Sequence, residues 1–139
     1  MRKINKIIIH CSATPEGRHV TVEDIDKWHR DRGFNGIGYH YVVYIDGSVH
    51  QGREEAIQGA HCAGHNSKSI GICYIGGCVN VNGKLVSKDT RTAAQKEALS
   101  NLVQDLIEKY PNATVHGHNE FSQKDCPCFD VREEYEYVV

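Results

Sequence analysis

Short apolar segments alternate with polar turns along much of the chain, a pattern typical of β-strands joined by tight connections. Residues 4–10, 39–45 and 69–75 are continuous runs rich in β-branched, aromatic or other apolar side chains, as expected for buried strands. Turn residues indicate two hairpins. The turns are Asp46-Gly47, before a strand over 48–51, and Asn82-Gly83, between strands over 79–81 and 84–86; a further short strand is predicted over 114–116.

Two segments carry the apolar spacing of amphipathic helices. Thr21 and Thr92 each begin a capping box, in which the threonine side chain and the residue three positions later satisfy the free backbone groups of the first turn. We therefore predict a short helix over 22–32 and a longer one over 92–109, which a Tyr-Pro pair ends.

The mixture of strands and helices predicts an α/β fold. A length of 139 residues suits one compact domain, and no linker, repeat or low-complexity tract divides the chain. We expect residues 1–139 to form a single domain, with a mixed central β-sheet whose faces are covered by the two helices.

Charge and hydropathy exclude several classes of protein. The 16 Lys and Arg residues are balanced by 18 Asp and Glu residues, so the chain has no overall positive charge to attract nucleic acid or an anionic membrane. No apolar run approaches the roughly 20 residues of a membrane-spanning helix, and the amino-terminal residues lack the apolar core of a secretory signal. The sequence predicts a protein with no nucleic-acid partner and no membrane association, held in the cytoplasm with reduced thiols.

Nine histidines and six cysteines make a metal site the first chemistry to consider. A catalytic zinc ion binds three imidazole, thiolate or carboxylate ligands and leaves a fourth position for water. His10 closes the first predicted strand, while His118 and Cys126 lie eight positions apart in a polar loop that can present both to one ion. The spacing leaves another interpretation open, in which His10 is an ordinary hydrogen-bonded histidine at a strand end.

Five short motifs occur in a fixed order, and together they resemble a known family. They are His10-Cys11-Ser12-Ala13-Thr14, Gly38-Tyr39-His40-Tyr41, Asp46-Gly47 leading to Gly52-Arg53, the stretch from His61 to Gly71, and Lys124-Asp125-Cys126-Pro127-Cys128-Phe129-Asp130. In this order they are similar to the type 2 N-acetylmuramoyl-L-alanine amidases, particularly the small lysozyme-amidases of tailed phages, which are relatives of the peptidoglycan recognition proteins. The resemblance extends over nearly the whole chain.

The resemblance implies an amidase/peptidoglycan recognition protein-like fold and an enzyme that hydrolyses the amide bond between N-acetylmuramic acid and L-alanine in peptidoglycan. It implies one zinc ion per chain, with His10, His118 and Cys126 as ligands and with Tyr39 and Lys124 as catalytic residues. Peptidoglycan is the expected partner of a monomeric, bacteriolytic enzyme of the phage or prophage endolysin type, cytoplasmic until its release to the cell wall.

The two implied catalytic residues suit the reaction of a zinc-bound water with an amide. Lys124 can stabilise the negative charge of the tetrahedral transition state, and Tyr39 can hydrogen-bond the attacking water and relay a proton to the leaving amine. The sequence leaves the division of these roles open. Without the resemblance, Tyr39 would be interpreted as a packing aromatic and Lys124 as a solvated loop cation.

The other polar residues of these motifs admit two interpretations. His61, His65 and Asn66 either form a wall of the substrate groove or cap a polar loop. Cys128 is a departure from the family, which carries a small hydroxyl-bearing residue there, so the choice of Cys126 as the ligand rests on the resemblance. Asp130 is a candidate to orient a ligand histidine.

Two other functions compete with the amidase. A peptidoglycan recognition module without turnover arises in this superfamily when the thiolate ligand is lost, and the presence of Cys126 argues against it. An amidase that also binds and inhibits an RNA polymerase is the second alternative, and no feature of the sequence marks a surface for it.

Overall fold

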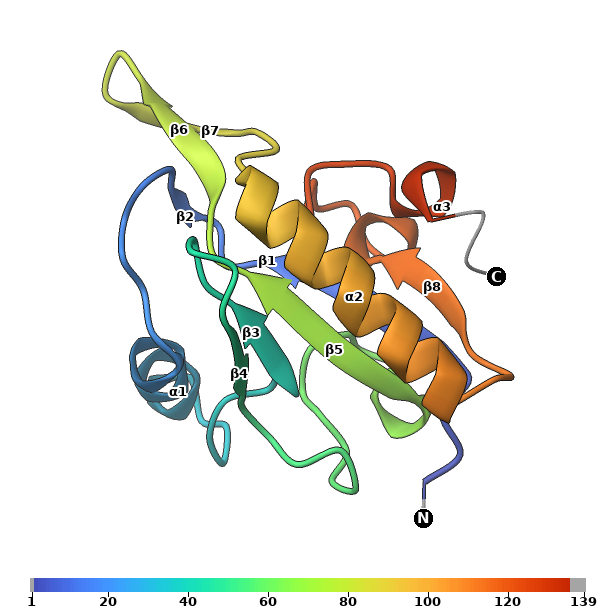
Figure 1. Cartoon of the computed structure of the whole chain (residues 1–139). Helices are drawn as coiled ribbons and strands as arrows, with labels where there is room; N and C mark the ends of the chain where they lie inside the picture. The colour runs from blue at the N-terminus through green and yellow to red at the C-terminus, as the bar shows by residue number, and fades with distance from the viewer. Residues whose placement is uncertain (1, 136–139) are drawn as a thin grey trace.

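A five-stranded sheet forms the centre of the structure, a computed structural model that describes residues 2–135 (Figure 1). In spatial order its strands are β4 (Val49–Gln51), β3 (Tyr41–Val43), β5 (Ser69–Tyr74), β1 (Lys6–Cys11) and β8 (Thr114–Gly117). Strands β3, β5, β1 and β8 run parallel to one another, whereas β4 pairs antiparallel with β3. The prediction of an α/β fold with a mixed central sheet is confirmed.

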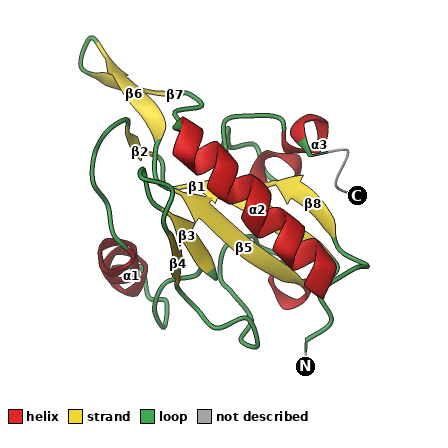
Figure 2. Ribbon diagram, in the orientation of Figure 1, coloured by secondary structure: helices red, strands yellow, loops and turns green. Residues whose placement is uncertain are grey.

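The long helix α2 (Ala93–Lys109) lies across one face of this sheet (Figure 2). Its Leu99 and Val103 share a buried cluster with Ile7 and Ile9 of β1. Because side chains alternate along a strand, Ile8 and His10 lie on the opposite face of β1. The face away from α2 is therefore the one on which His10 is presented.

The shorter helix α1 (Val22–Asp31) belongs to a separate core. Its Ile25 is buried with Val42 of β3 and Ile75, and Val42 alternates with Val43, which belongs to the α2 cluster. The two helices thus cover opposite faces of the sheet, as the sequence predicts. No helix among the described residues is long and apolar enough to cross a membrane.

A second, three-stranded sheet was not predicted. It consists of β2 (Thr14–Pro15), β6 (Gly77–Val81) and β7 (Lys84–Ser87), and the β6–β7 hairpin projects from the body of the fold (Figure 1). The predicted turn between β6 and β7 is present, with φ of 52° at Asn82 and 84° at Gly83. Strand β2 has only two residues, too few to show an alternating pattern, and it is a strand because it pairs with β6.

Several boundaries differ from the prediction for local reasons. Strand β3 begins two residues later than predicted, so Tyr39 precedes it, and the connection to β4 is a longer loop in which the Asp46 carboxylate accepts a hydrogen bond from the Ser48 amide at 2.9 Å. Three short helices carry too few apolar residues to show a helical period. They are η1 (Asn66–Lys68), η2 (His118–Glu120) and α3 (Val131–Glu134).

Candidate metal centre

The side chains of His10, His118 and Cys126 meet at the end of the central sheet where the parallel strands β1 and β8 have their carboxyl ends. One ligand atom from each lies within 4.8 Å of the others. His10 is the last residue but one of strand β1, and His118 directly follows β8, the parallel neighbour of β1. Parallel strands bring their carboxyl ends to one edge, so the fold places the two histidines together although they are far apart in sequence.

The Cys126 thiol is held by contacts with the strands of the sheet. Its Sγ accepts a hydrogen bond from the backbone amide of Cys11 at 3.1 Å. The Tyr74 hydroxyl donates to the carbonyl of Pro127 at 2.7 Å, which fixes the following residue. A loop residue is thereby positioned by β1 and β5, and the backbone contribution of Cys11 is one that the sequence did not reveal.

Burial keeps both imidazoles of this centre in the neutral form. The pKa of His10 is well below its ordinary value, first because the ring is buried and then because His61 and His118 are close. Burial also lowers the pKa of His118, with a smaller effect from the Lys124 ammonium. Neutral imidazole is the form that binds metal ions, and two imidazoles with one thiol are a donor set that suits zinc.

The candidate centre lies in a cleft of about 600 Å³. Tyr39, His61, Asn66 and Lys124 line this cleft together with the three candidate ligands. His65 is not among the lining residues, and its ring packs against Phe121 with 4.2 Å between centroids. The structure therefore brings seven of the eight candidate residues to one cavity. The sequence did not single out the cleft residues that α1 and the following loop supply, which include Trp28, His29, Arg32 and Phe34.

Tyr39 is partly buried beside the candidate ligand His10. Their ring centroids are 5.1 Å apart, and the Tyr39 ring is also 5.3 Å from that of His29. Burial raises the pKa of the Tyr39 hydroxyl well above its ordinary value, and nearby thiols, with Cys73 first, raise it further. The phenol consequently keeps its proton at neutral pH and is available as a hydrogen-bond donor.

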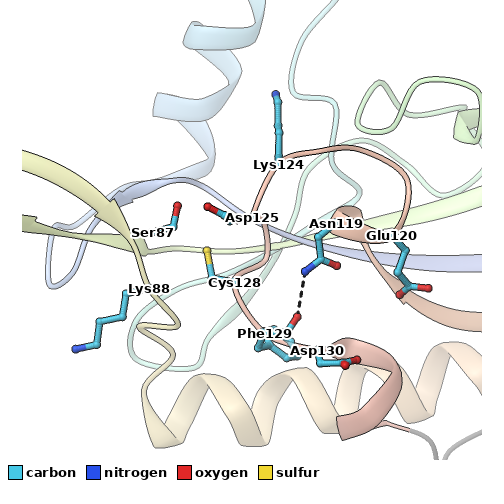
Figure 3. A pocket seen from close by; sticks show the side chains of 9 residues that line it. All are labelled: Ser87, Lys88, Asn119, Glu120, Lys124, Asp125, Cys128, Phe129 and Asp130. Carbon is cyan, nitrogen blue, oxygen red and sulfur yellow. Dashed lines mark hydrogen bonds between the residues drawn. The ribbon is translucent and has the colours of Figure 1, made fainter.

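Lys124 borders the cleft and also a second hollow of about 560 Å³. Figure 3 shows this second hollow, with the Cys128 sulfur pointing toward Ser87 and Asp125 and with the Lys124 and Lys88 side chains extending in different directions. The Cys128 thiol donates to the carbonyl of Gly77 at 3.4 Å, and burial raises its pKa to about 12. The two thiols of the Cys-Pro-Cys segment thus face different hollows.

The polar groups of His61 and Asn66, in the predicted groove wall, form hydrogen bonds with other groups of the protein. Asn66 Oδ1 accepts hydrogen bonds from the backbone amides of His61 and Cys62, both at 2.9 Å. The two ring nitrogens of His61 lie 2.8 Å from His10 Nε2 and 3.2 Å from Ser69 Oγ. Asn66 therefore acts as a loop cap while it also borders the cleft.

The Asp130 carboxylate lies at the start of α3. It accepts a hydrogen bond from the Glu133 amide at 3.0 Å and so caps that helix. The structure contradicts the prediction that Asp130 orients a ligand histidine, because the carboxylate bonds this helix amide and the group beside His10 is the His61 imidazole. No apolar period marks α3 in the sequence, so this capping role was not predicted.

The chain is similar in sequence to known proteins over most of its length. The family profile described as N-acetylmuramoyl-L-alanine amidase matches residues 1–129. The endolysin of Escherichia phage T7 is 38% identical over 130 residues, which cover 94% of this chain and 84% of that protein.

Solved structures show the same fold. The N-acetylmuramoyl-L-alanine amidase LysC from Clostridium intestinale superimposes with a TM-score of 0.79 at 29% identity, covering 99% of this chain and 83% of that one. Drosophila PGRP-LB also gives a TM-score of 0.79, at 26% identity over 98% of this chain and 81% of that one. These similarities support the expectation of an amidase/peptidoglycan recognition protein-like fold.

Proposed function

Since the chain belongs to the N-acetylmuramoyl-L-alanine amidase family and is a peptidoglycan amidase of the endolysin type, we propose that its activity depends on one zinc ion held by His10, His118 and Cys126. The bond cleaved is the amide between the lactyl group of N-acetylmuramic acid and L-alanine. The observation that carries the proposal is the convergence of two neutral imidazoles and a thiol, within 4.8 Å of one another, in a cleft bordered by Tyr39 and Lys124.

The donor set accounts for the chemistry that the cleft requires. Bound zinc supplies an acidified water, with a pKa of about 7, and a Lewis acid for the scissile carbonyl. Three protein ligands are what a catalytic site provides, because one position stays open. The chain contributes to this by burying His10 and by holding Cys126 with the Cys11 amide.

Lys124 and Tyr39 are proposed to act on the substrate directly. The Lys124 ammonium stabilises the negative charge that develops on the carbonyl oxygen in the transition state. Tyr39, whose raised pKa keeps it protonated, donates a hydrogen bond and moves a proton toward the leaving amine of L-alanine. Of the predicted groove wall, His61 and Asn66 border the substrate by their position in the cleft, whereas His65 packs against Phe121 and does not line the cleft.

The proposal extends to the organisation of the protein. Residues 1–139 act as one zinc amidase domain, which binds peptidoglycan as a monomer. Helices α1 and α2 pack on the two faces of one central sheet, which supports the assignment of a single domain.

Digestion of purified peptidoglycan identifies the bond that is cleaved. We expect new amino-terminal L-alanine to appear together with muramic acid that carries a free lactyl carboxylate, because hydrolysis of this amide releases both. No new reducing sugar ends are expected. Reducing ends without new alanine termini would indicate glycosidase activity and would contradict the proposal.

A further inference from the structure

The His61 ring lies between the candidate ligand His10 and a buried serine. His61 Nδ1 is 2.8 Å from His10 Nε2, and His61 Nε2 is 3.2 Å from Ser69 Oγ. The two imidazoles meet nearly edge to face, with 4.9 Å between centroids and an interplanar angle of 88°. His10, His61 and Ser69 therefore form a continuous polar chain that leads away from the metal centre into the sheet.

The backbone around His61 leaves room for this ring and for little else. A Cβ atom at Gly71 would lie 2.7 Å from the His61 ring, and one at Gly59 would also lie 2.7 Å from it. Real Cβ contacts are essentially never this short, so a side chain at either position would displace the imidazole. Asn66 holds the backbone amide of His61 at the same time. Gly59 and Gly71 thus leave space for the ring, and Asn66 fixes the backbone from which it projects.

When His10 binds a metal, only one placement of the ring protons on His10 and His61 satisfies both hydrogen bonds of the chain. A neutral imidazole has one donor and one acceptor nitrogen, and a metal occupies the acceptor. Since His10 Nε2 faces His61, Nδ1 is the nitrogen left for the metal, and Nε2 must carry the proton. His61 Nδ1 then accepts that proton's hydrogen bond, and His61 Nε2 donates to Ser69 Oγ.

We propose that His61 is a positioning residue for the metal centre, which fixes the tautomer and the orientation of His10 and so raises zinc affinity. Metal-bound histidines usually donate their second N–H to such an outer partner, and loss of the partner weakens metal binding. In most sites the partner is a carboxylate, a backbone carbonyl or water, whereas here it is a second imidazole. The inference rests on the proposed function, in which His10 is a zinc ligand.

The zinc dissociation constant, measured by competition with a chelator, tests this role without reference to activity. His61→Ala is expected to raise it by about 10- to 100-fold. His61→Asn is expected to recover part of the loss, because the asparagine carbonyl oxygen reaches about the position of the imidazole Nδ1. His50→Ala is a matched control in the same sheet, outside the cleft, and its zinc affinity is expected to equal that of the wild type.

Zinc binding by the wild type and by His61→Ala distinguishes failure of the role of His61 from failure of the proposed function. If the wild type binds no zinc, the proposed function fails. If the wild type binds zinc and the folded His61→Ala protein binds it equally well, only the role of His61 is overturned. Should His61→Ala not fold, Ser69→Ala removes the second hydrogen bond of the chain and is expected to raise the dissociation constant by about fivefold; an unchanged value in that folded variant would likewise overturn the role.

Nitrogen NMR of the zinc-loaded wild type provides an independent readout. The structure leads us to expect a proton on His10 Nε2 and metal on Nδ1. A His10 ring protonated at Nδ1 in the zinc-loaded protein would contradict the inferred chain of hydrogen bonds.

Discussion

Replacement of Cys126 by alanine is expected to remove zinc from the protein and to lower amide hydrolysis by on the order of 10³-fold or more. The variant leaves two imidazoles to hold the ion, which is fewer than the three ligands of a catalytic zinc site. Zinc content after dialysis and the rate of alanine release from peptidoglycan measure the two effects. The wild type is expected to retain about one ion per chain.

Cys128→Ser is the matched control for this substitution. Cys128 is two residues from Cys126, but its thiol lines the second hollow and donates to the Gly77 carbonyl. We therefore expect the serine variant to keep its zinc and its rate. The reverse pattern, with zinc lost in Cys128→Ser and kept in Cys126→Ala, would move the ligand to Cys128.

Replacement of Lys124 by alanine is expected to lower the rate by about 10²- to 10³-fold while zinc content stays unchanged. The ammonium group acts on charge that exists only in the transition state, so its loss affects the rate of the chemical step more than binding of the metal. Rates on purified peptidoglycan, together with zinc content, separate this effect from loss of the metal centre.

Lys88→Ala is a suitable comparison, because Lys88 lines the second hollow and not the cleft. Its rate is expected to equal that of the wild type. A Lys124→Ala protein that binds zinc and cleaves at the wild-type rate would show that this lysine has no part in the transition state.

The main elements of the fold could be predicted from local patterns. The apolar segment that became β1 and the capping boxes at Thr21 and Thr92 define their elements by neighbouring residues alone, and both capping boxes are present in the structure. Strand β2 could not be predicted, because its two residues become a strand only by pairing with β6, more than 60 positions away. Helix α3 has a single buried position within its four residues, Val131, too little for a period.

The candidate ligands could be predicted from the sequence, whereas the contacts between their side chains and other residues could not. His10 could be placed at a strand end by the run of isoleucines before it, and the structure brings it to His118 because β1 and β8 are parallel neighbours. The contact between His10 and His61 spans 51 positions and depends on how the loop before β5 folds back over the sheet. No spacing rule identifies such a contact, so His61 was interpreted as a groove wall or a loop cap.

Removal and restoration of zinc in the amide-cleavage assay show whether the enzyme needs the metal to cleave its substrate. We expect a strong chelator to abolish the release of amino-terminal L-alanine from purified peptidoglycan, and added zinc to restore it in the wild type but not in Cys126→Ala. Alanine release that continues at the full rate in the metal-free protein would contradict this expectation.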